Sequence, residues 1–189
     1  MGRKGEEKRQ RIVDAANTLF YHKGFTATSF ADIADDCGVP KGNFYFYFRT
    51  KEELLDAVVR ERMERLARHL DTIHQDFPDP RARLHRIANV PFNDRHKVAQ
   101  YGCPMGTLSA ELGKLTPVGQ NALSSMYTLI IMAICHCLEG LGLDHDASMR
   151  QARHMLTRLQ GASNLAQTFK DESWLETEIE AIHEWIDVL

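Results

Sequence analysis

Apolar residues recur every three or four positions along most of this chain, which is the spacing of one face of an α-helix. Proline and glycine separate the helical runs, and Pro91 with Asn93 predicts a loop or kink up to Lys97. The sequence therefore predicts an all-α fold. The expected helices cover residues 7–22, 29–37, a short run from Pro40, 51–77, 81–90, 104–115, 117–140, 147–169 and 174–189.

Residues 28–51 contain two short helical patterns with one tight turn between them. Thr28 or Ser29 can cap the first helix, whose apolar face comprises Phe30, Ile33, Ala34 and Cys37. Gly38 suits the end of that helix, and Pro40 suits the first turn of the next. A helix, a glycine-containing turn and a second helix make the helix-turn-helix layout.

The second helix has more large and polar side chains than a small core can bury. Val39, Phe44 and Phe48 can face inward, which leaves Lys41, Asn43, Tyr45, Phe46 and Tyr47 outside. Lysine reaches phosphate or guanine, asparagine reads adenine, and aromatic edges touch thymine methyl groups or phosphates. This composition favours a helix that enters a DNA major groove.

The charge distribution agrees with a DNA-binding N-terminal end. Residues 1–51 contain nine Lys and Arg against six Asp and Glu, a balance of +3, whereas residues 52–189 contain fourteen against twenty, −6. A phosphate-facing surface requires such a basic end. Residues 1–7 are expected to be a frayed basic arm, with insertion into a minor groove as the alternative.

Residues 8–56 resemble the DNA-binding domain of TetR/AcrR-type transcriptional repressors. The resemblance rests on Thr28, Ile33, Ala34, Gly38, Val39, Lys41, Gly42, Tyr45, Tyr47, Phe48, Lys51, Glu52 and Leu54. It implies a DNA-binding surface made of Thr28, Ser29, Lys41, Gly42, Asn43, Tyr45, Phe46, Tyr47 and Lys51. Lys41, Asn43 and Phe46 would face bases, and Thr28, Tyr45, Tyr47 and Lys51 would face phosphates. Asn43 and Phe46 depart from the residues common in the family, so its operator preferences do not transfer.

The chain divides into a three-helix DNA-binding domain, residues 1–50, and a larger helical bundle, residues 51–189. Residues 51–77 could span nearly 40 Å as one helix, at about 1.5 Å per residue, and act as a lever between the domains. Residues 123–138 are apolar on nearly every side, so a partner chain is the natural cover. The helices at 117–140 and 147–169, paired with their symmetry mates, would form a four-helix interface of a homodimer. Two recognition helices would then lie roughly 34–36 Å apart, or a multiple, on a near-palindromic site.

The sequence lacks features that would indicate export, a cofactor or an enzyme activity. The polar start does not read as a signal peptide, and the apolar run 129–138 is ten residues, too short for a bilayer. We expect a cytoplasmic protein with reduced cysteines and no membrane contact. Cys135 and Cys137 point about 200° apart on a helix, so no metal site is predicted there, and no cofactor. No arrangement of catalytic residues supports an enzyme.

The effector is expected to bind in the larger domain. Residues 102–112 resemble a motif from one subgroup of TetR-like regulators, in some of which the cysteine reacts with electrophiles. Cys103 could do so, because a thiol near a helix N-terminus has a lowered pKa; it could also be an ordinary core residue. The candidates for a small organic effector are Met63, Phe92, Tyr101, Cys103, Met105, Tyr127 and His136.

The function predicted is a repressor that a small organic effector releases from double-stranded operator DNA. Effector binding would favour a spacing of the two recognition helices that no longer fits the half-sites. Two alternatives stay open: a repressor that senses electrophiles or redox state through Cys103, and a helical ligand-binding protein that no longer reads DNA.

Overall fold

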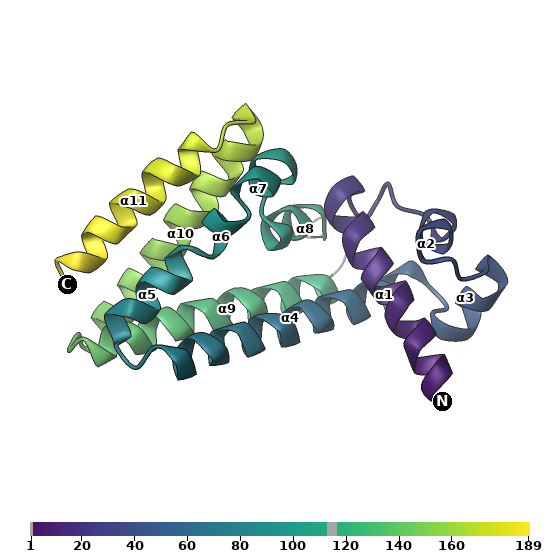
Figure 1. Ribbon diagram of the computed structural model, residues 1–189, viewed down its shortest axis with the longest axis horizontal. Helices are drawn as coiled ribbons and strands as arrows, with labels where there is room; N and C mark the ends of the chain where they lie inside the picture. The colour runs from purple at the N-terminus through teal and green to yellow at the C-terminus, as the bar shows by residue number, and fades with distance from the viewer. Residues whose placement is uncertain (1, 113–116) are drawn as a thin grey trace. The chain divides into compact units, whose positions relative to one another are not determined.

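The computed structural model describes residues 2–112 and 117–189, with the side chains of Lys41, 117–120 and 122 left out (Figure 1). Over these residues the chain forms helices only, in agreement with the predicted all-α class. The predicted end of one helix at residue 115 lies outside the described residues. The helices are α1 (Arg3–Lys23), α2 (Phe30–Cys37), α3 (Lys41–Tyr47), α4 (Lys51–Asp76), α5 (Pro80–Ala88), α6 (Val90–Asn93), α7 (Arg95–Tyr101), α8 (Pro104–Leu112), α9 (Pro117–Gly140), α10 (His145–Phe169) and α11 (Ser173–Asp187).

The chain packs as two compact units, and each unit is discontinuous in sequence. Unit 1 contains Met1–Glu64 and Thr107–Leu123, and unit 2 contains Arg65–Gly106 and Ser124–Leu189. Unit 1 therefore holds α1 to α3 together with the first part of α4 and pieces of α8 and α9. The functional division at residues 50 and 51 stays a prediction.

The core of unit 1 is the three-helix arrangement that the sequence predicts, extended by α4. Phe44 and Phe48 of the α3 region are 0% and 1% exposed, and Ile12 and Ile33 are 0% exposed. Further buried residues come from α1, α2, α4 and the connections on either side of α2: Val13, Ala16, Leu19, Phe20, Phe25, Ala34, Cys37, Val39, Leu54, Leu55, Val58 and Val59. Arg62 on α4 donates from Nε to Oδ1 of Asn17 on α1 at 2.6 Å.

The first helix begins earlier than predicted. α1 starts at Arg3, so residues 3–7 are helical and the expected frayed arm is wrong over that stretch. Arg3 and Glu7 form an i,i+4 pair at 3.5 Å, and Arg9 and Glu6 form an i,i+3 pair at 3.9 Å. Such pairs support an exposed first turn.

Unit 2 is a helical bundle around one apolar core. In it α10 packs against α7 and α11, and α11 packs against α5. The largest fully buried side chains of this unit are Leu84, Met126, Ile134, Leu138, Met155 and Leu175. The predicted larger bundle is therefore confirmed as a fold class.

The stretch after α5 is helical where a loop was predicted. Residues 90–93 form α6 and residues 95–101 form α7. Pro91 lies in the first turn of α6, where its missing N–H needs no intrahelical partner. The proline therefore starts a helix here instead of breaking one.

The apolar part of helix α9 is longer than the ten-residue run 129–138 on which the sequence analysis relied. Leu123–Gly140 is long and apolar enough, by length and composition, to cross a membrane, and 39% of it is buried. The statement that the apolar run is too short to cross is therefore wrong. Ile134, Cys135 and Leu138 are at most 1% exposed, so one face of α9 belongs to the core of unit 2.

Candidate nucleic-acid interface

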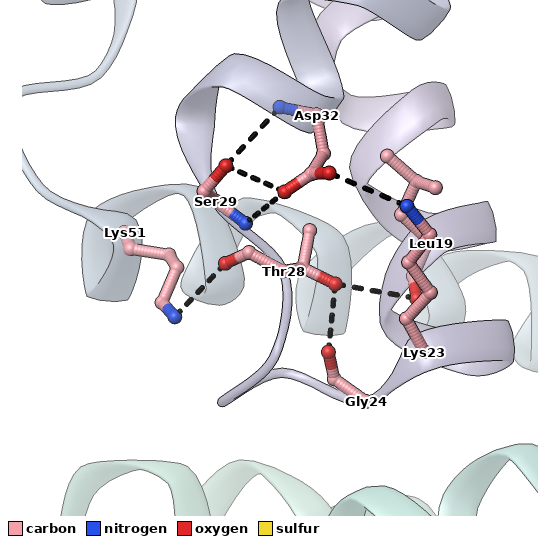
Figure 2. Close-up of polar contacts among 7 residues, drawn as sticks. All are labelled: Leu19, Lys23, Gly24, Thr28, Ser29, Asp32 and Lys51. Carbon is pink, nitrogen blue, oxygen red and sulfur yellow. Dashed lines mark hydrogen bonds and ion pairs between the residues drawn. The ribbon is translucent and has the colours of Figure 1, made fainter.

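The start of α2 is fixed by a reciprocal capping box (Figure 2). The Asp32 backbone N–H donates to Ser29 Oγ at 3.2 Å, and the Ser29 backbone N–H donates to Asp32 Oδ2 at 2.8 Å. Lys23 of α1 lies 3.3 Å from Asp32 Oδ1. The box satisfies two free N–H groups and so sets where the helix-turn-helix begins.

We expect the capping box to weaken in acid. Hydrogen bonds from the Ser29 side chain and backbone, followed by Lys23, lower the pKa of Asp32 from 3.8 to about 2. Because the folded-state pKa is the lower one, the stabilisation is fully present above the unfolded pKa and is lost as pH falls from about 4 to about 2. The stability difference between wild type and Asp32→Asn, from thermal unfolding at several pH values, should shrink over that window. A difference that stays constant down to about pH 2.5 would contradict this assignment.

The turn between α2 and α3 is short because one glycine takes a left-handed conformation. Gly38 has φ 64° and ψ 27°, which ends α2 at Cys37. The Arg11 guanidinium donates to the carbonyl oxygen of Cys37 and so caps the C-terminal end of α2. Val39 is 3% exposed, and its burial anchors the turn before Pro40 starts α3.

Helix α3 buries one aromatic face and exposes another. Phe44 is 0% exposed, whereas Tyr45 is 58% and Phe46 is 76% exposed. Asn43 is also exposed, and Tyr47 is half-buried with its ring 5.1 Å from that of Phe46. Among the described residues Phe46 keeps most of its surface in contact with solvent, so burial within the unit does not account for an aromatic residue there. The predicted outward position of Lys41 lies outside the described side chains.

The space around Gly42, at the start of α3, is open. Apart from its chain neighbours and the backbone of α3 itself, no described heavy atom lies within 4 Å of the position where a Cβ would stand. Glycine lowers helix stability by about 1 kcal/mol relative to alanine. The fold therefore does not require glycine at this position, although a closely approaching partner would.

Two residues that the resemblance assigned to phosphate serve the fold (Figure 2). Thr28 is 1% exposed, and its hydroxyl donates to the carbonyl of Gly24 at 2.7 Å. The Lys51 ammonium donates to the carbonyls of Phe25, Thr26 and Thr28 at 2.9, 3.3 and 3.0 Å. In the absence of DNA their donors are used within the protein, so a phosphate contact by either side chain stays a prediction.

Sequence analysis missed a residue that holds the same loop from its other side. Glu111 on α8 accepts from the backbone N–H of Phe25 at 2.8 Å and of Thr26 at 2.9 Å. A Cβ on Gly24, which has φ 87°, would lie 3.1 Å from Glu111 Oε1, so the carboxylate packs directly on the turn. No sequence signal links residues 85 positions apart, except that Glu111 belongs to the motif around Cys103.

The predicted effector residues do not form one group. Cys103 and Tyr127 both form hydrogen bonds with Gln160. Gln160 Nε2 donates to Cys103 Sγ at 3.5 Å, and the Tyr127 hydroxyl donates to Gln160 Oε1 at 3.3 Å. Burial, and then the nearby Cys103, raise the pKa of Tyr127, so its phenol stays a donor at neutral pH. A Cβ on Gly106 would lie 3.0 Å from Gln160 Oε1, so α8 and the Gln160 side chain pack closely here. Gln160 was not predicted.

The other candidates make different contacts. Met63 belongs to unit 1. Phe92 packs on the core of unit 2 with the Arg95 guanidinium 4.5 Å from its ring centre, and Met105 is packed on that core. His136 is exposed on α9, its ring 6.0 Å from that of His74.

His136 instead borders a cavity of about 210 Å³ in unit 2. Residues of α4, α5 and α9 line it, including Leu70, His74, Arg83, Leu129, Met132, His136 and Cys137. Tyr101 does not line this cavity, nor do Cys103 and Tyr127. The candidates thus divide between the Cys103 group, the cavity and other positions.

A short helix with an exposed aromatic and amide face, held by a tight turn behind a capped helix, defines a helix-turn-helix DNA-binding protein. Residues 12–58 match the sequence family described as "Bacterial regulatory proteins, tetR family". An uncharacterized HTH-type transcriptional regulator in the lacX 3′ region of Lactococcus lactis subsp. lactis is 29% identical over 177 residues, or 92% of this chain and 90% of that protein. The HTH-type transcriptional repressor DhaR of Mycobacterium sp. (strain GP1) is 27% identical over 130 residues, or 69% of this chain and 65% of that protein.

The fold agrees with these sequence matches. A TetR transcriptional regulator from Legionella pneumophila superposes with a TM-score of 0.82 at 23% identity, and the match covers 97% of each chain. The chain is thus similar to TetR-family transcriptional regulators, in sequence through residues 12–58 and in fold over 97% of its length. Regulators of this family bind operator DNA and act as dimers.

Proposed function

We propose that this chain is a repressor whose α3 reads operator DNA and whose unit 2 dimerises and binds a small organic effector. The observation that carries the proposal is the solvent-facing aromatic surface of α3, with Phe46 76% exposed. The relative DhaR, a repressor by name, supports repression as the output. Such a protein would act in the cytoplasm, where its operator lies.

The roles on α3 follow from exposure. Asn43 and Phe46 face solvent and would contact base edges, together with Lys41. Tyr45 is exposed and Tyr47 half-buried, which suits phosphate contacts by their hydroxyl groups. Ser29 is exposed at the N-terminal end of α2, although its hydroxyl already serves the capping box.

Gly42→Ala tests the DNA surface without harming the fold. We expect the variant to be as stable as wild type or up to about 1 kcal/mol more stable, because alanine favours helix and meets nothing. If α3 lies against DNA, the added methyl group should weaken binding to the fragment upstream of the gene by about tenfold or more. Fluorescence anisotropy at several salt concentrations measures this, and wild-type affinity should fall steeply with salt.

Two results would oppose this part of the proposal. Unchanged DNA affinity in Gly42→Ala would mean that DNA does not approach the start of α3. Wild-type binding that is weak and insensitive to salt would favour the alternative of a helical ligand-binding protein that no longer reads DNA.

The dimer interface is proposed on unit 2, with α10 at its centre. Leu165 and Phe169 on α10 are 36% and 60% exposed, and Met132 on α9 is 46% exposed. Trp174, at the start of α11, is 41% exposed and stacks on Phe169 with ring centres 5.3 Å apart. A second copy that covers this apolar surface explains it without lipid.

Phe169→Glu should convert the dimer to monomers and reduce operator affinity by at least tenfold. A charge placed on an apolar interface is left without a partner, which costs several kcal/mol. Analytical ultracentrifugation measures the oligomeric state, and Met132→Glu tests whether α9 takes part as predicted. A dimer that survives both substitutions would rule out this surface.

The effector is proposed to bind beside Cys103 and Tyr127, where half-buried polar groups meet the apolar core. Because the Cys103 thiol lies directly before α8, the electrophile-sensing alternative stays open. Cys103→Ser distinguishes the two, since a repressor that binds its effector reversibly should still respond to it. Loss of the response to electrophiles alone would favour the alternative.

A further inference from the structure

A buried thiol, a carboxylate and an imidazole converge where α9 turns into α10. Cys135 Sγ, a carboxylate oxygen of Glu139 and His145 Nδ1 all lie within 4.8 Å of one another. His145 Nδ1 and Glu139 Oε1 are 2.7 Å apart. Ligand atoms about 2.0–2.3 Å from a tetrahedral ion lie less than about 4 Å from one another, so small side-chain adjustments would allow all three to coordinate one ion.

Helix α9 places two of these groups. Cys135 and Glu139 are four residues apart, so they lie on one face near the end of the helix at Gly140. Cys135 is 1% exposed, whereas Glu139 is exposed. A thiol held under an exposed carboxylate is reachable by a small ion once that carboxylate turns toward it.

The turn brings the third group back to the same end. Gly142 has φ 98°, and the Leu143 N–H donates to the carbonyl of Leu138 at 3.2 Å. Asp144 then caps α10 by accepting from the Ala147 N–H at 2.8 Å. These bonds fix His145 as the first residue of α10, so the site rests on a rigid turn.

We propose that Cys135, Glu139 and His145 form a binding site for a divalent transition-metal ion of the zinc type. One sulfur, one nitrogen and one oxygen donor suit Zn²⁺ and Co²⁺, whereas Mg²⁺ and Ca²⁺ prefer oxygen donors alone. Three protein ligands leave a fourth position for water. The ion would tie α9 to α10 at their shared turn.

The protonation states agree with a metal-free resting form. Burial, followed by Glu139, raises the pKa of the Cys135 thiol, and the hydrogen bond to Glu139 raises the pKa of His145. Metal binding therefore releases the thiol proton, and any proton on His145, to the solvent. The sequence search for paired cysteines or histidines missed this site because its ligands span a turn and include a carboxylate.

The test uses full-length, tag-free protein that has been treated with a chelator and kept reduced. Added Co²⁺ should produce a thiolate-to-cobalt charge-transfer band and the visible bands of a tetrahedral complex, and Zn²⁺ should displace both. Saturating Zn²⁺ should raise the Tm by roughly 5 °C or more. The proposal does not depend on DNA binding.

Two variants and a control locate the ion. Cys135→Ser should remove the charge-transfer band, and His145→Gln, at an exposed position, should weaken cobalt binding by about tenfold or more. His154→Gln replaces an exposed histidine elsewhere on α10 and should bind like wild type. The absence of the charge-transfer band in wild type, or wild-type binding in both site variants, would overturn the proposal.

Discussion

Phe44→Ala is expected to unfold the helix-turn-helix and abolish DNA binding. The Phe44 ring is 0% exposed and packs 5.5 Å from the ring of Phe30, so it joins α3 to α2. Truncating a buried phenylalanine costs about 3–5 kcal/mol, a large part of the stability of a small domain. Hydrogen exchange of the α2 and α3 amides, measured with operator binding, would show both losses.

Phe46→Ala is the matched control on the same helix. Its ring is 76% exposed, so the stability should stay within about 0.5 kcal/mol of wild type. Operator affinity should still fall, by about 1–3 kcal/mol if the ring contacts a base edge. If Phe44→Ala keeps wild-type exchange protection, or Phe46→Ala loses it, the division of α3 into a buried and a reading face is wrong.

Lys51→Met is expected to destabilise unit 1 by about 2–4 kcal/mol. The substitution removes three charge-assisted hydrogen bonds to the loop between α1 and α2. Each such bond is worth about 1.5–3 kcal/mol, although shared bonds on a half-exposed group do not add in full. It also removes a cation–π contact, since Nζ lies 4.4 Å from the centre of the Phe25 ring.

The same variant separates the structural role of Lys51 from the phosphate contact that the family resemblance implied. A phosphate contact would leave stability unchanged and reduce the salt dependence of DNA binding by about one unit of slope. Arg60→Met, an exposed position on α4, controls for the loss of a positive charge. Denaturant unfolding followed by operator binding in salt would show which outcome holds.

Glu111→Gln probes the other side of that loop. The amide cannot accept from both the Phe25 and Thr26 N–H groups as a carboxylate does. Combined with Lys51→Met it should destabilise less than the two single changes together, because both residues order the same loop, residues 24–29. Strict additivity would mean that the two contacts act independently.

The helices and the recognition motif could be read from the sequence because they depend on local patterns. Apolar spacing predicted the long helices to within a few residues, and the Thr50 hydroxyl caps α4 by accepting from the Glu53 N–H at 3.1 Å. The exposed face of α3 could also be anticipated, since its aromatic residues were too many to bury.

The features that the sequence did not show depend on contacts that form only once the chain has folded. Thr28 and Lys51 carry the right chemistry for phosphate, but their backbone partners appear only once the loop is folded. Glu111 meets its loop across 85 positions. Trp174 fits an inward helical pattern, yet it stacks on exposed Phe169. Periodicity shows which side of a helix is apolar but does not show whether this chain or another one covers it.

The split of unit 1 between residues 1–64 and 107–123 affects how new regulators can be engineered from this one. A chimera that exchanges only the first 50 residues would introduce a foreign DNA-binding domain without the α8 segment that holds its loop. Transplanting both segments together would carry Lys51 and Glu111 with the turn they hold. We therefore expect that a change of operator specificity in this protein requires the exchange of both segments. A recombination library with a single crossover point should yield few functional hybrids.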